Sequence, residues 1–476
     1  MKKKIITLLM LPVVMFTACE RDLSDINVDP KNPLNAPAYA FYSNAQVNLM
    51  DELTSTNVNE NIFRLIMQYW QETTYIDESQ YDLTTREIPE QMWDYLNRDV
   101  IRDLREAKRL IPEQIDDAGV RQNQLAIAEI TEIVAWYYLV TSFGDIPYSQ
   151  AQDPNKILPQ YDPQQEVYYD LLARLDAAIS QLNPASESFG DADLIYGGDV
   201  TSWQRFANSF KLKMGMTIAD SDPTRARTLV ESAVAAGVFT SNADNAVIVY
   251  TAAPPNTNPV WDDLVQSGRR DFVAASTIVN RMLDLDDPRI DEYFQAQPGG
   301  VYVGGTPGES SPWAQFSKPG LAFYDATNPA TLMDYSEVEF FLAEAVERGF
   351  NVPGSAQEHY NNAIRASIQF WEGTEAEAAA YLAQPEVAYS SANWQQRIGE
   401  QKWIALYNRG WESWIEWRRL DAPTLEPATD AFSDIPVRFT YPIEEQNVNT
   451  ANYNAAVARI PGGEDVVEAR LFWDVR

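Results

Sequence analysis

Residues 130–151 read Ile-Thr-Glu-Ile-Val-Ala-Trp-Tyr-Tyr-Leu-Val-Thr-Ser-Phe-Gly-Asp-Ile-Pro-Tyr-Ser-Gln-Ala. Within this stretch, Ile130, Val134, Tyr137 and Thr141 recur at three- and four-residue spacing, with Ile133 and Val140 beside them. This spacing places apolar side chains on one face of an α-helix, where they can be buried against other helices. The stretch therefore predicts a helix with a buried face.

The same spacing recurs in later parts of the chain. It is carried by Leu171, Leu172, Leu175, Ile179 and Leu182, by Phe340, Phe341 and Ala345, and by Trp403, Tyr407, Trp411 and Trp414. Gly349 predicts a helix stop, and a new helix is expected over residues 356–371. Strand-like runs are few, and residues 246–250 are the clearest. The sequence predicts a mostly all-α fold of helix pairs, the scale of unit found in tetratricopeptide arrays.

Residues 296–331 differ from the rest of the chain. They are rich in Gly, Pro, Ser and aromatic residues and show no helical period. A long irregular segment inside a compact protein is usually either functional or disordered. The aromatic residues interleaved in it argue against disorder; they are Tyr302, Trp313, Phe316, Phe323 and Tyr324.

The N-terminus predicts export and lipidation. Lys2, Lys3 and Lys4 precede a mostly apolar run over residues 5–16, which is shorter than the roughly 20 residues of a membrane span. Phe-Thr-Ala-Cys over residues 16–19 resembles a lipobox, and Cys19 is the only cysteine in the chain. We expect a signal peptide over residues 1–18, a lipidated tether over 19–36 and one domain over 37–476. The alternative is an ordinary secretory signal with an incidental cysteine.

Composition excludes several classes of function. The net charge of −33 becomes about −36 once residues 1–18, with three Lys and no acid, are removed. Such a surface repels phosphate backbones, so nucleic acid is a poor ligand. His359 is the only histidine and lies in a predicted helix, which favours a packing or surface role over zinc binding or triad catalysis. No phosphate-binding glycine loop is present, and residues 284–287 lack the Gly and downstream Glu of an EF-hand loop. We therefore expect no cofactor, and the sequence identifies no metal ligands.

Several pieces of the chain, in order, resemble the SusD/RagB family of surface lipoproteins. They are Leu-Ser-Asp-Ile-Asn-Val-Asp-Pro-Lys-Asn-Pro over 23–33, Ser-Phe-Gly-Asp-Ile-Pro-Tyr-Ser-Gln-Ala over 142–151, Asp-Pro-Arg-Ile over 287–290, the Glu-rich helix over 337–345, Gln-Lys-Trp-Ile-Ala-Leu over 401–406 with Glu-Trp-Arg-Arg over 416–419, and Arg-Phe-Thr-Tyr-Pro over 438–442. Phe143 stands where the family more often has Trp, which indicates a divergent branch.

This resemblance implies a single, mostly helical domain with a tetratricopeptide-like scaffold and irregular ligand-binding loops. It also implies an outer-membrane lipoprotein that faces the cell exterior and partners a SusC-like TonB-dependent transporter. Such proteins deliver oligosaccharides or, in some members, peptides, and they are not enzymes. A glycoside hydrolase is a further alternative, because two carboxylates suffice for that chemistry.

In the family, ligand-contacting aromatic residues come from the region after an early helix and from the large irregular segment. Here those regions contain Trp70, Tyr75 and Tyr81, and Tyr302, Trp313 and Tyr324. Flat aromatic rings suit the apolar faces of sugars. Trp70 follows Phe63, Ile66 and Met67 in helical register, so core packing is at least as good an interpretation of it as ligand contact. Trp313 is the best single candidate, with loop packing as its alternative, and Tyr75 is expected on a loop.

Overall fold

The structure, a computed structural model, describes residues 36–476. The predicted signal peptide, the lipidation of Cys19 and nearly all of the predicted tether lie outside the described residues. Residues 38–476 form one compact unit.

The stretch quoted first forms the second half of α6 (Ala118–Phe143). The carboxylate of Asp117 caps the start of α6 by accepting hydrogen bonds from the backbone N–H groups of Gly119 and Val120. The helix ends at Gly144, whose φ of 87° suits glycine. α6 is long and apolar enough to cross a membrane, but 89% of its apolar window is buried inside the fold. It is therefore a core helix.

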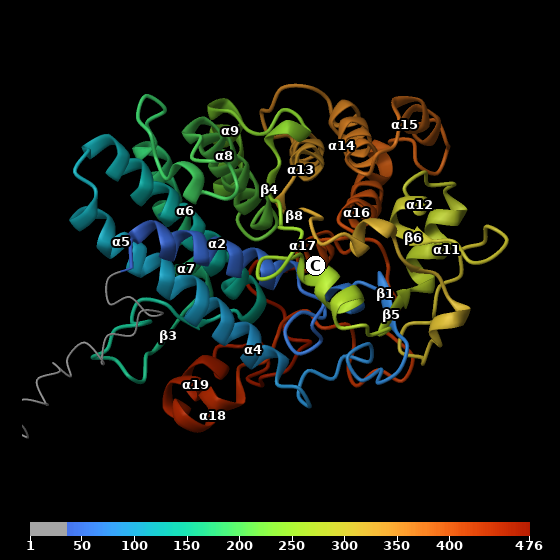
Figure 1. Ribbon diagram of the computed structural model, residues 1–476, viewed down its shortest axis with the longest axis horizontal. Coiled ribbons are helices and arrows are strands. Elements are labelled where there is room, and N and C mark those ends of the chain that lie inside the picture. The colour runs from blue at the N-terminus through green and yellow to red at the C-terminus, as the bar shows by residue number, and fades with distance from the viewer. Residues whose placement is uncertain (1–35) are drawn as a thin grey trace, which may run out of the picture. The chain divides into compact units, whose positions relative to one another are not determined.

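Helices pack in pairs, as the sequence predicts: α2 with α5, α6 with α7, α8 with α9 and α13 with α14 (Figure 1). Their bounds are α2 Ala38–Thr54, α3 Phe63–Ile66, α4 Ile88–Tyr95, α5 Arg102–Gln114, α7 Gln164–Gln181, α8 Val200–Thr217, α9 Pro223–Ala236, α10 Pro259–Trp261, α11 Ser276–Asp284, α12 Ile290–Tyr293, α13 Tyr335–Glu347, α14 Ala356–Phe370, α15 Glu375–Leu382, α16 Trp394–Ala405, α17 Gly410–Leu420, α18 Ile443–Val448 and α19 Thr450–Val457. Two π-helical stretches, η3 (Leu96–Ile101) and η6 (Asp262–Gln266), extend α4 and α10. The prediction of a mostly α-helical, tetratricopeptide-like fold is confirmed.

The strands of residues 36–476 form short antiparallel pairs, namely β1 (Trp70–Glu72) with β5 (Phe272–Ala274), β2 (Ile146–Pro147) with β3 (Tyr161–Asp162), β4 (Ala246–Ile248) with β8 (Ala330–Met333), and β6 (Phe294–Gln295) with β7 (Lys318–Pro319). The predicted strand over 246–250 is thus observed as β4, two residues shorter. Two of these four pairs, β1 with β5 and β4 with β8, join segments that are far apart in sequence.

The tryptophan stripe that begins at Trp403 spans two helices instead of one. α16 ends at Ala405 and α17 begins at Gly410. A side chain at Gly410 would have its Cβ 2.7 Å from the backbone nitrogen of Arg64 and 2.8 Å from the backbone carbon of Phe63. The break therefore lets the start of α17 lie directly against α3.

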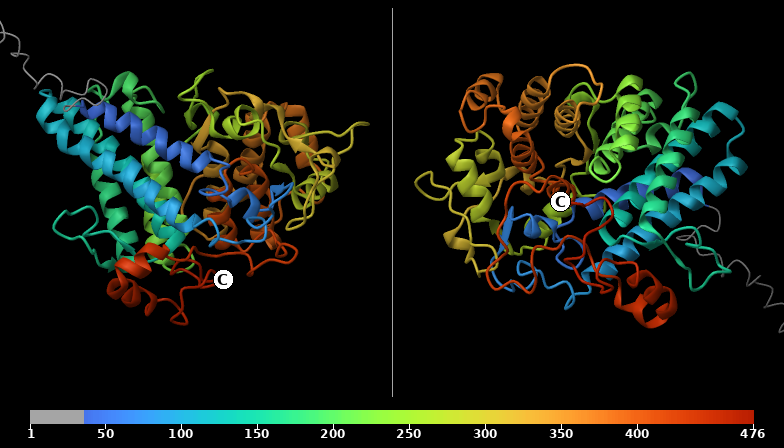
Figure 2. Two further views of the ribbon diagram at one scale, coloured as in Figure 1. Left: turned by 60° about the horizontal axis from the view of Figure 1, so that its bottom comes forward. Right: turned by 180° about the vertical axis from the view of Figure 1, so that it is seen from behind.

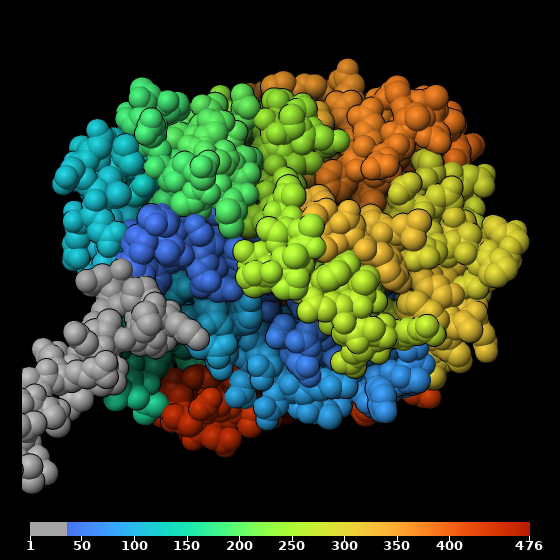
Figure 3. Space-filling model, viewed as in Figure 1, coloured from blue at the N-terminus to red at the C-terminus, as the bar shows by residue number. Residues whose placement is uncertain are grey.

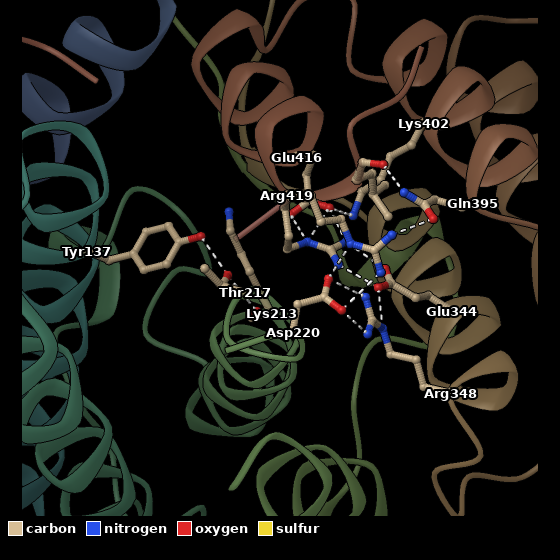
Figure 4. A network of polar contacts seen from close by, with 12 residues as sticks. Tyr137, Lys213, Thr217, Asp220, Glu344, Arg348, Gln395, Lys402, Glu416 and Arg419 are labelled. Carbon is tan, nitrogen blue, oxygen red and sulfur yellow. Dashed lines mark hydrogen bonds and ion pairs between the residues drawn. The ribbon is translucent and has the colours of Figure 1, made fainter. Parts of the chain in front are cut away.

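A buried network of charges joins α13, α16, α17 and the turn after α8 (Figure 4). Arg419 donates from both terminal nitrogens to the Glu344 carboxylate at 2.6 Å and also contacts Glu416 at 2.6 Å. Glu416 accepts from Lys402 at 2.7 Å, while Arg348 links Glu344 to Asp220. Paired in this way, the charges connect α13, α16 and α17 with the turn after α8.

The C-terminal segment returns to the early part of the chain. In both views of Figure 2, the red helices α18 and α19 lie beside the loop between β2 and β3. The Asn449 side-chain amide donates to the carbonyl of Pro159 at 2.9 Å, and the Tyr161 hydroxyl donates to Glu445 at 2.8 Å.

Candidate functional site

The two regions that the sequence singles out lie side by side in the structure. The side-chain amide of Gln71, in β1, donates to the carbonyl of Glu309 at 2.9 Å, and its oxygen accepts from the N–H of Gly308 at 2.9 Å. The hydroxyl of Ser310 donates to the carbonyl of Thr73 at 2.7 Å. The loop after β1 is thus fastened to the irregular segment by side-chain hydrogen bonds.

A third segment, from the last part of the chain, joins these two. The N–H of Thr429 donates to the carbonyl of Pro307 at 2.9 Å, and the N–H of Phe432 donates to the carbonyl of Gln80 at 2.9 Å. We call residues 71–82, 301–318 and 425–433 together the three-segment surface. Residues 425–433 carry no sequence signal of a site other than an aromatic residue in a polar stretch, and sequence analysis missed them.

Two large aromatic side chains of this surface are exposed to solvent. Tyr75 is 78% exposed and Phe432 is 67% exposed. Tyr75 also has a φ of 55°, in the left-handed region that a bulky residue adopts only when its surroundings impose it. The surrounding turns therefore hold the Tyr75 ring outward at a cost in backbone energy.

Trp313 adds a partly buried ring to the three-segment surface. It begins a short 3₁₀ turn, η7 (Trp313–Gln315). The ammonium nitrogen of Lys318 lies 5.7 Å from the centre of the Trp313 ring and donates to the carbonyl of Phe316 at 2.6 Å. Burial lowers the pKa of Lys318. Trp313 thus lies near the ammonium group of Lys318 and is only partly buried.

Tyr302 and Tyr324 occupy different positions. The hydroxyl of Tyr302, on the three-segment surface, donates a hydrogen bond to Asp291. Burial is the main cause of its raised pKa, and the hydrogen bond to Asp291 is the next largest. Tyr324 ends the 3₁₀ turn η8 (Leu321–Tyr324) and packs against the core outside the three segments. Its hydroxyl is buried and has no hydrogen-bond partner within residues 36–476.

Trp70 and Tyr81 are buried, with exposed fractions of 1% and 3%. The indole N–H of Trp70 donates to the hydroxyl of Tyr407 at 2.7 Å, and its ring meets Phe323 edge-on at 5.6 Å. The hydroxyl of Tyr81 accepts from the N–H of Ala428 at 3.2 Å. Trp70 therefore has the core-packing role that its register allowed, and Tyr81 fastens the third segment. Neither ring offers a face to a ligand, so neither is retained among our proposed contacts.

Two carboxyl groups are buried beneath the loop that carries Tyr75. Glu72 accepts from the N–H and hydroxyl of Ser79 at 2.9 and 2.8 Å, while Glu78 pairs with Arg86. Burial is the main cause that raises the pKa of Glu72, to about 9, and the negative charge of Glu78 is the second. At neutral pH Glu72 is therefore protonated, which removes the repulsion between the two groups.

Other residues weighed from the sequence have structural contacts. The ring nitrogens of His359 contact Glu339 at 2.8 Å and the carbonyl of Pro353 at 2.7 Å. Asp287, in the acidic turn, forms a buried ion pair with Arg289 at 2.6 Å. Within residues 36–476, no group of three or more His, Cys, Asp or Glu side chains is arranged to hold a metal ion.

The third segment borders two hollows, and Leu425 lines both of them. The first, of about 320 Å³, includes Thr277, Asn280, Arg281, Gln396, Glu400 and Thr424 in its lining. The second, of about 300 Å³, includes Trp417, Asp434, Glu468 and Arg470. Both hollows thus combine polar side chains with Leu425 of the third segment.

Comparison with known proteins supports one family. A family model for SusD-like proteins, described as starch-binding and associating with the outer membrane, matches residues 30–442. No curated protein sequence matches the chain.

Solved structures match over nearly the whole chain. A chitin-binding SusD homologue from Flavobacterium johnsoniae is 25% identical, with a TM-score of 0.81; the match covers 92% of this chain and 99% of that one. A SusD homologue from Bacteroides uniformis is 27% identical, with a TM-score of 0.80; the match covers 93% of this chain and all of that one. A protein described as chitin-binding is 26% identical, with a TM-score of 0.80 and coverage of 92% and 100%.

Proposed function

The chain belongs to the family of SusD-like proteins, and from that membership we propose that it captures neutral oligosaccharides at the surface of the outer membrane. The observation that carries the proposal is the pair of exposed rings, Tyr75 and Phe432. Both belong to the three-segment surface, which also includes Trp313. Two of the structural relatives are described as chitin-binding, which supports a glycan as the ligand class.

The chemistry of this surface suits a sugar. Pyranose rings present apolar C–H faces, which pack on aromatic rings, and a rim of hydroxyl groups, which needs polar partners. Exposed Glu309 and Ser310 lie between Gly308 and Trp313 on the same surface. A net charge of −33 disfavours polyanionic glycans, so the proposed ligand is uncharged.

We further propose that the protein is held by lipid on Cys19 and faces the exterior. There it passes its ligand to a SusC-like TonB-dependent transporter, and it binds without cleaving. These parts of the proposal rest on the family and on the lipobox sequence. A peptide ligand and glycosidase activity are the competing functions, and the experiment below separates them.

The test is isothermal titration of residues 20–476 with chito- and malto-oligosaccharides, plant and host glycans, and mixed peptides. Tyr75→Ala and Trp313→Ala are compared with Tyr39→Ala, which removes a tyrosine ring that is 55% exposed on the first turn of α2, outside the three segments. A loss of about tenfold or more in glycan affinity, in the first two variants only, is expected from the loss of a stacked ring.

Three outcomes would overturn parts of the proposal. Glycan binding that survives both substitutions would move the site away from the three-segment surface. Binding of peptides alone would replace the ligand class. Release of new reducing ends from any bound glycan would make the protein a hydrolase.

A further inference from the structure

A group of five carboxylates surrounds the end of α2. Asp51 and Glu52 belong to its last turn, Glu60 follows in the next loop, and Asp262 and Asp263 begin η6. The hydroxyl of Thr56 donates to Asp263 at 2.6 Å and joins the two parts. Figure 3 shows the lime-green residues around η6 beside the blue residues of α2 and its following loop.

The basic side chains near this group are engaged with other partners. Arg98 is paired with Asp99 at 2.6 Å and Arg269 with Asp271 at 2.6 Å. Arg64 donates to the carbonyls of Ser55 and Asn408. Across residues 36–476, none of the five carboxylates has a Lys or Arg nitrogen within ion-pair distance.

Glu52 is the least accessible member of the group. It is 1% exposed, and neither of its carboxylate oxygens has a hydrogen-bond partner within residues 36–476. The charges that act on it most strongly are those of Glu60, Asp51 and Asp99, all negative. A buried ionised carboxylate without a partner is costly, so Glu52 needs either a cation or a proton.

Asn48 supplies a neutral oxygen atom on the same side of α2 as Glu52. Asn48 lies one helical turn before Glu52, and its amide nitrogen donates to the carbonyl of Asp99 at 3.1 Å. Its oxygen is thereby turned away from that carbonyl and lies 3.5 Å from the hydroxyl of Tyr95. Calcium binds six to eight oxygen ligands from carboxylates, amides, carbonyls and water.

We propose that Glu52 is a ligand of a divalent cation of the calcium class, with Glu60 and the side-chain oxygen of Asn48 as further ligands. No three acidic side chains of the described residues already form a metal-binding group. Backbone carbonyls and water would therefore supply the rest of the six to eight oxygen ligands that calcium takes. Glu52 is almost completely buried, so among the proposed ligands its side chain is the one whose position the fold constrains most.

This cation would stabilise elements beneath the proposed binding surface. η6 ends at Gln266, and β5, the partner of β1, begins at Phe272. β1 in turn leads directly into the loop that carries Tyr75. The test of this proposal measures cation binding, so its result does not depend on which glycan or peptide the protein binds.

The test uses chelator-treated protein covering residues 20–476. Tb³⁺ titration, with excitation of tyrosine, reports a lanthanide near Tyr95 and Tyr250, whose hydroxyl donates to Asp51 at 2.8 Å. Competition with Ca²⁺ and thermal unfolding at 1 mM Ca²⁺ follow. Glu52→Gln and Glu60→Gln each remove a carboxylate charge while keeping the shape of the side chain, the second at a less buried position. Glu72→Gln makes the same change at a buried acid outside the five carboxylates and is the matched control.

We expect sensitised Tb³⁺ emission that Ca²⁺ displaces, and a rise in melting temperature of about 3 °C with 1 mM Ca²⁺ in the wild type. Glu60→Gln should lose tenfold or more in affinity, Glu52→Gln should lose both signals, and Glu72→Gln should keep both. The proposal is overturned if the wild type gives no displaceable emission and no shift. It is also overturned if Glu52→Gln and Glu60→Gln bind as the wild type does, since the ion then lies elsewhere.

Discussion

The backbone N–H of Phe432 donates to the carbonyl of Gln80 at 2.9 Å, which places a ring that is 67% exposed next to the loop that carries Tyr75. The two residues are separated by most of the chain. Their contact adds Phe432, which sequence analysis missed, to the surface where we propose that glycans bind.

Phe432→Ala should weaken glycan binding about tenfold, because a ring that stacks on a sugar contributes about 1–1.5 kcal/mol. Its free energy of unfolding should change by less than about 0.5 kcal/mol, since the ring is largely in solvent. Isothermal titration and urea denaturation check the two values. Ile157→Ala, at an apolar residue that is 86% exposed, is the control and should change neither. Unchanged affinity in Phe432→Ala would remove this residue from the site.

Trp70→Phe should have the opposite profile. The substitution removes the hydrogen bond from the indole N–H to the Tyr407 hydroxyl and leaves a small cavity, which together cost about 2–3 kcal/mol in the free energy of unfolding. Glycan affinity of the folded variant should stay within about twofold, because the ring has no solvent-exposed face. A loss of affinity at full stability would instead return Trp70 to the binding site.

Glu72→Gln should alter the dependence of stability on pH. The pKa of Glu72 is about 9 in the fold and 4.5 for an ordinary glutamate, so between these values the folded chain binds more protons than the unfolded chain. The stability from this group is complete below about pH 4.5 and is lost as the pH rises toward 9.

Glutamine mimics the protonated acid at every pH. The variant should therefore gain stability relative to the wild type as the pH is raised from 5 to 9, as measured by urea denaturation. Asp116→Asn, at an exposed acid, is the control. Parallel stability curves for the wild type and Glu72→Gln would show that Glu72 titrates normally.

Arg419→Met should destabilise the protein by about 3–5 kcal/mol, because it leaves the buried carboxylates of Glu344 and Glu416 without their strongest partner. Arg98→Met breaks a largely exposed pair with Asp99 and should cost less than about 0.5 kcal/mol. Chemical denaturation compares them. Equal effects would mean that the network in Figure 4 adds little to stability.

Cys19→Ser should release the protein from the membrane fraction, because no thiol is then left to carry an acyl chain. Metabolic labelling with palmitate and detergent-phase partition measure the effect. Ser24→Ala, in the predicted tether, is the control. Retention of label in Cys19→Ser would disprove lipidation at this residue.

Much of the architecture could be predicted from local patterns. The buried face of α6, the stop at Gly349 and the helix over 356–370 follow from apolar spacing and from turn residues, which act over a few positions. The break between α16 and α17 does not follow from the apolar spacing, and the close approach of α3 at Gly410 is a contact that only the tertiary structure shows. Spacing alone makes the stripe from Trp403 to Trp414 continuous.

The candidate site, like the fold, could be predicted only in part from the sequence. The sequence by itself determined the helical class, the likeness to SusD-like proteins, and the two regions rich in aromatic residues, because these depend on residue type and order. Only the tertiary structure decided that Trp70 and Tyr81 face inward, that Tyr75 faces outward, and that Phe432 joins it. The exposure of a ring depends on contacts between residues hundreds of positions apart, and helical or strand periodicity carries no record of those contacts.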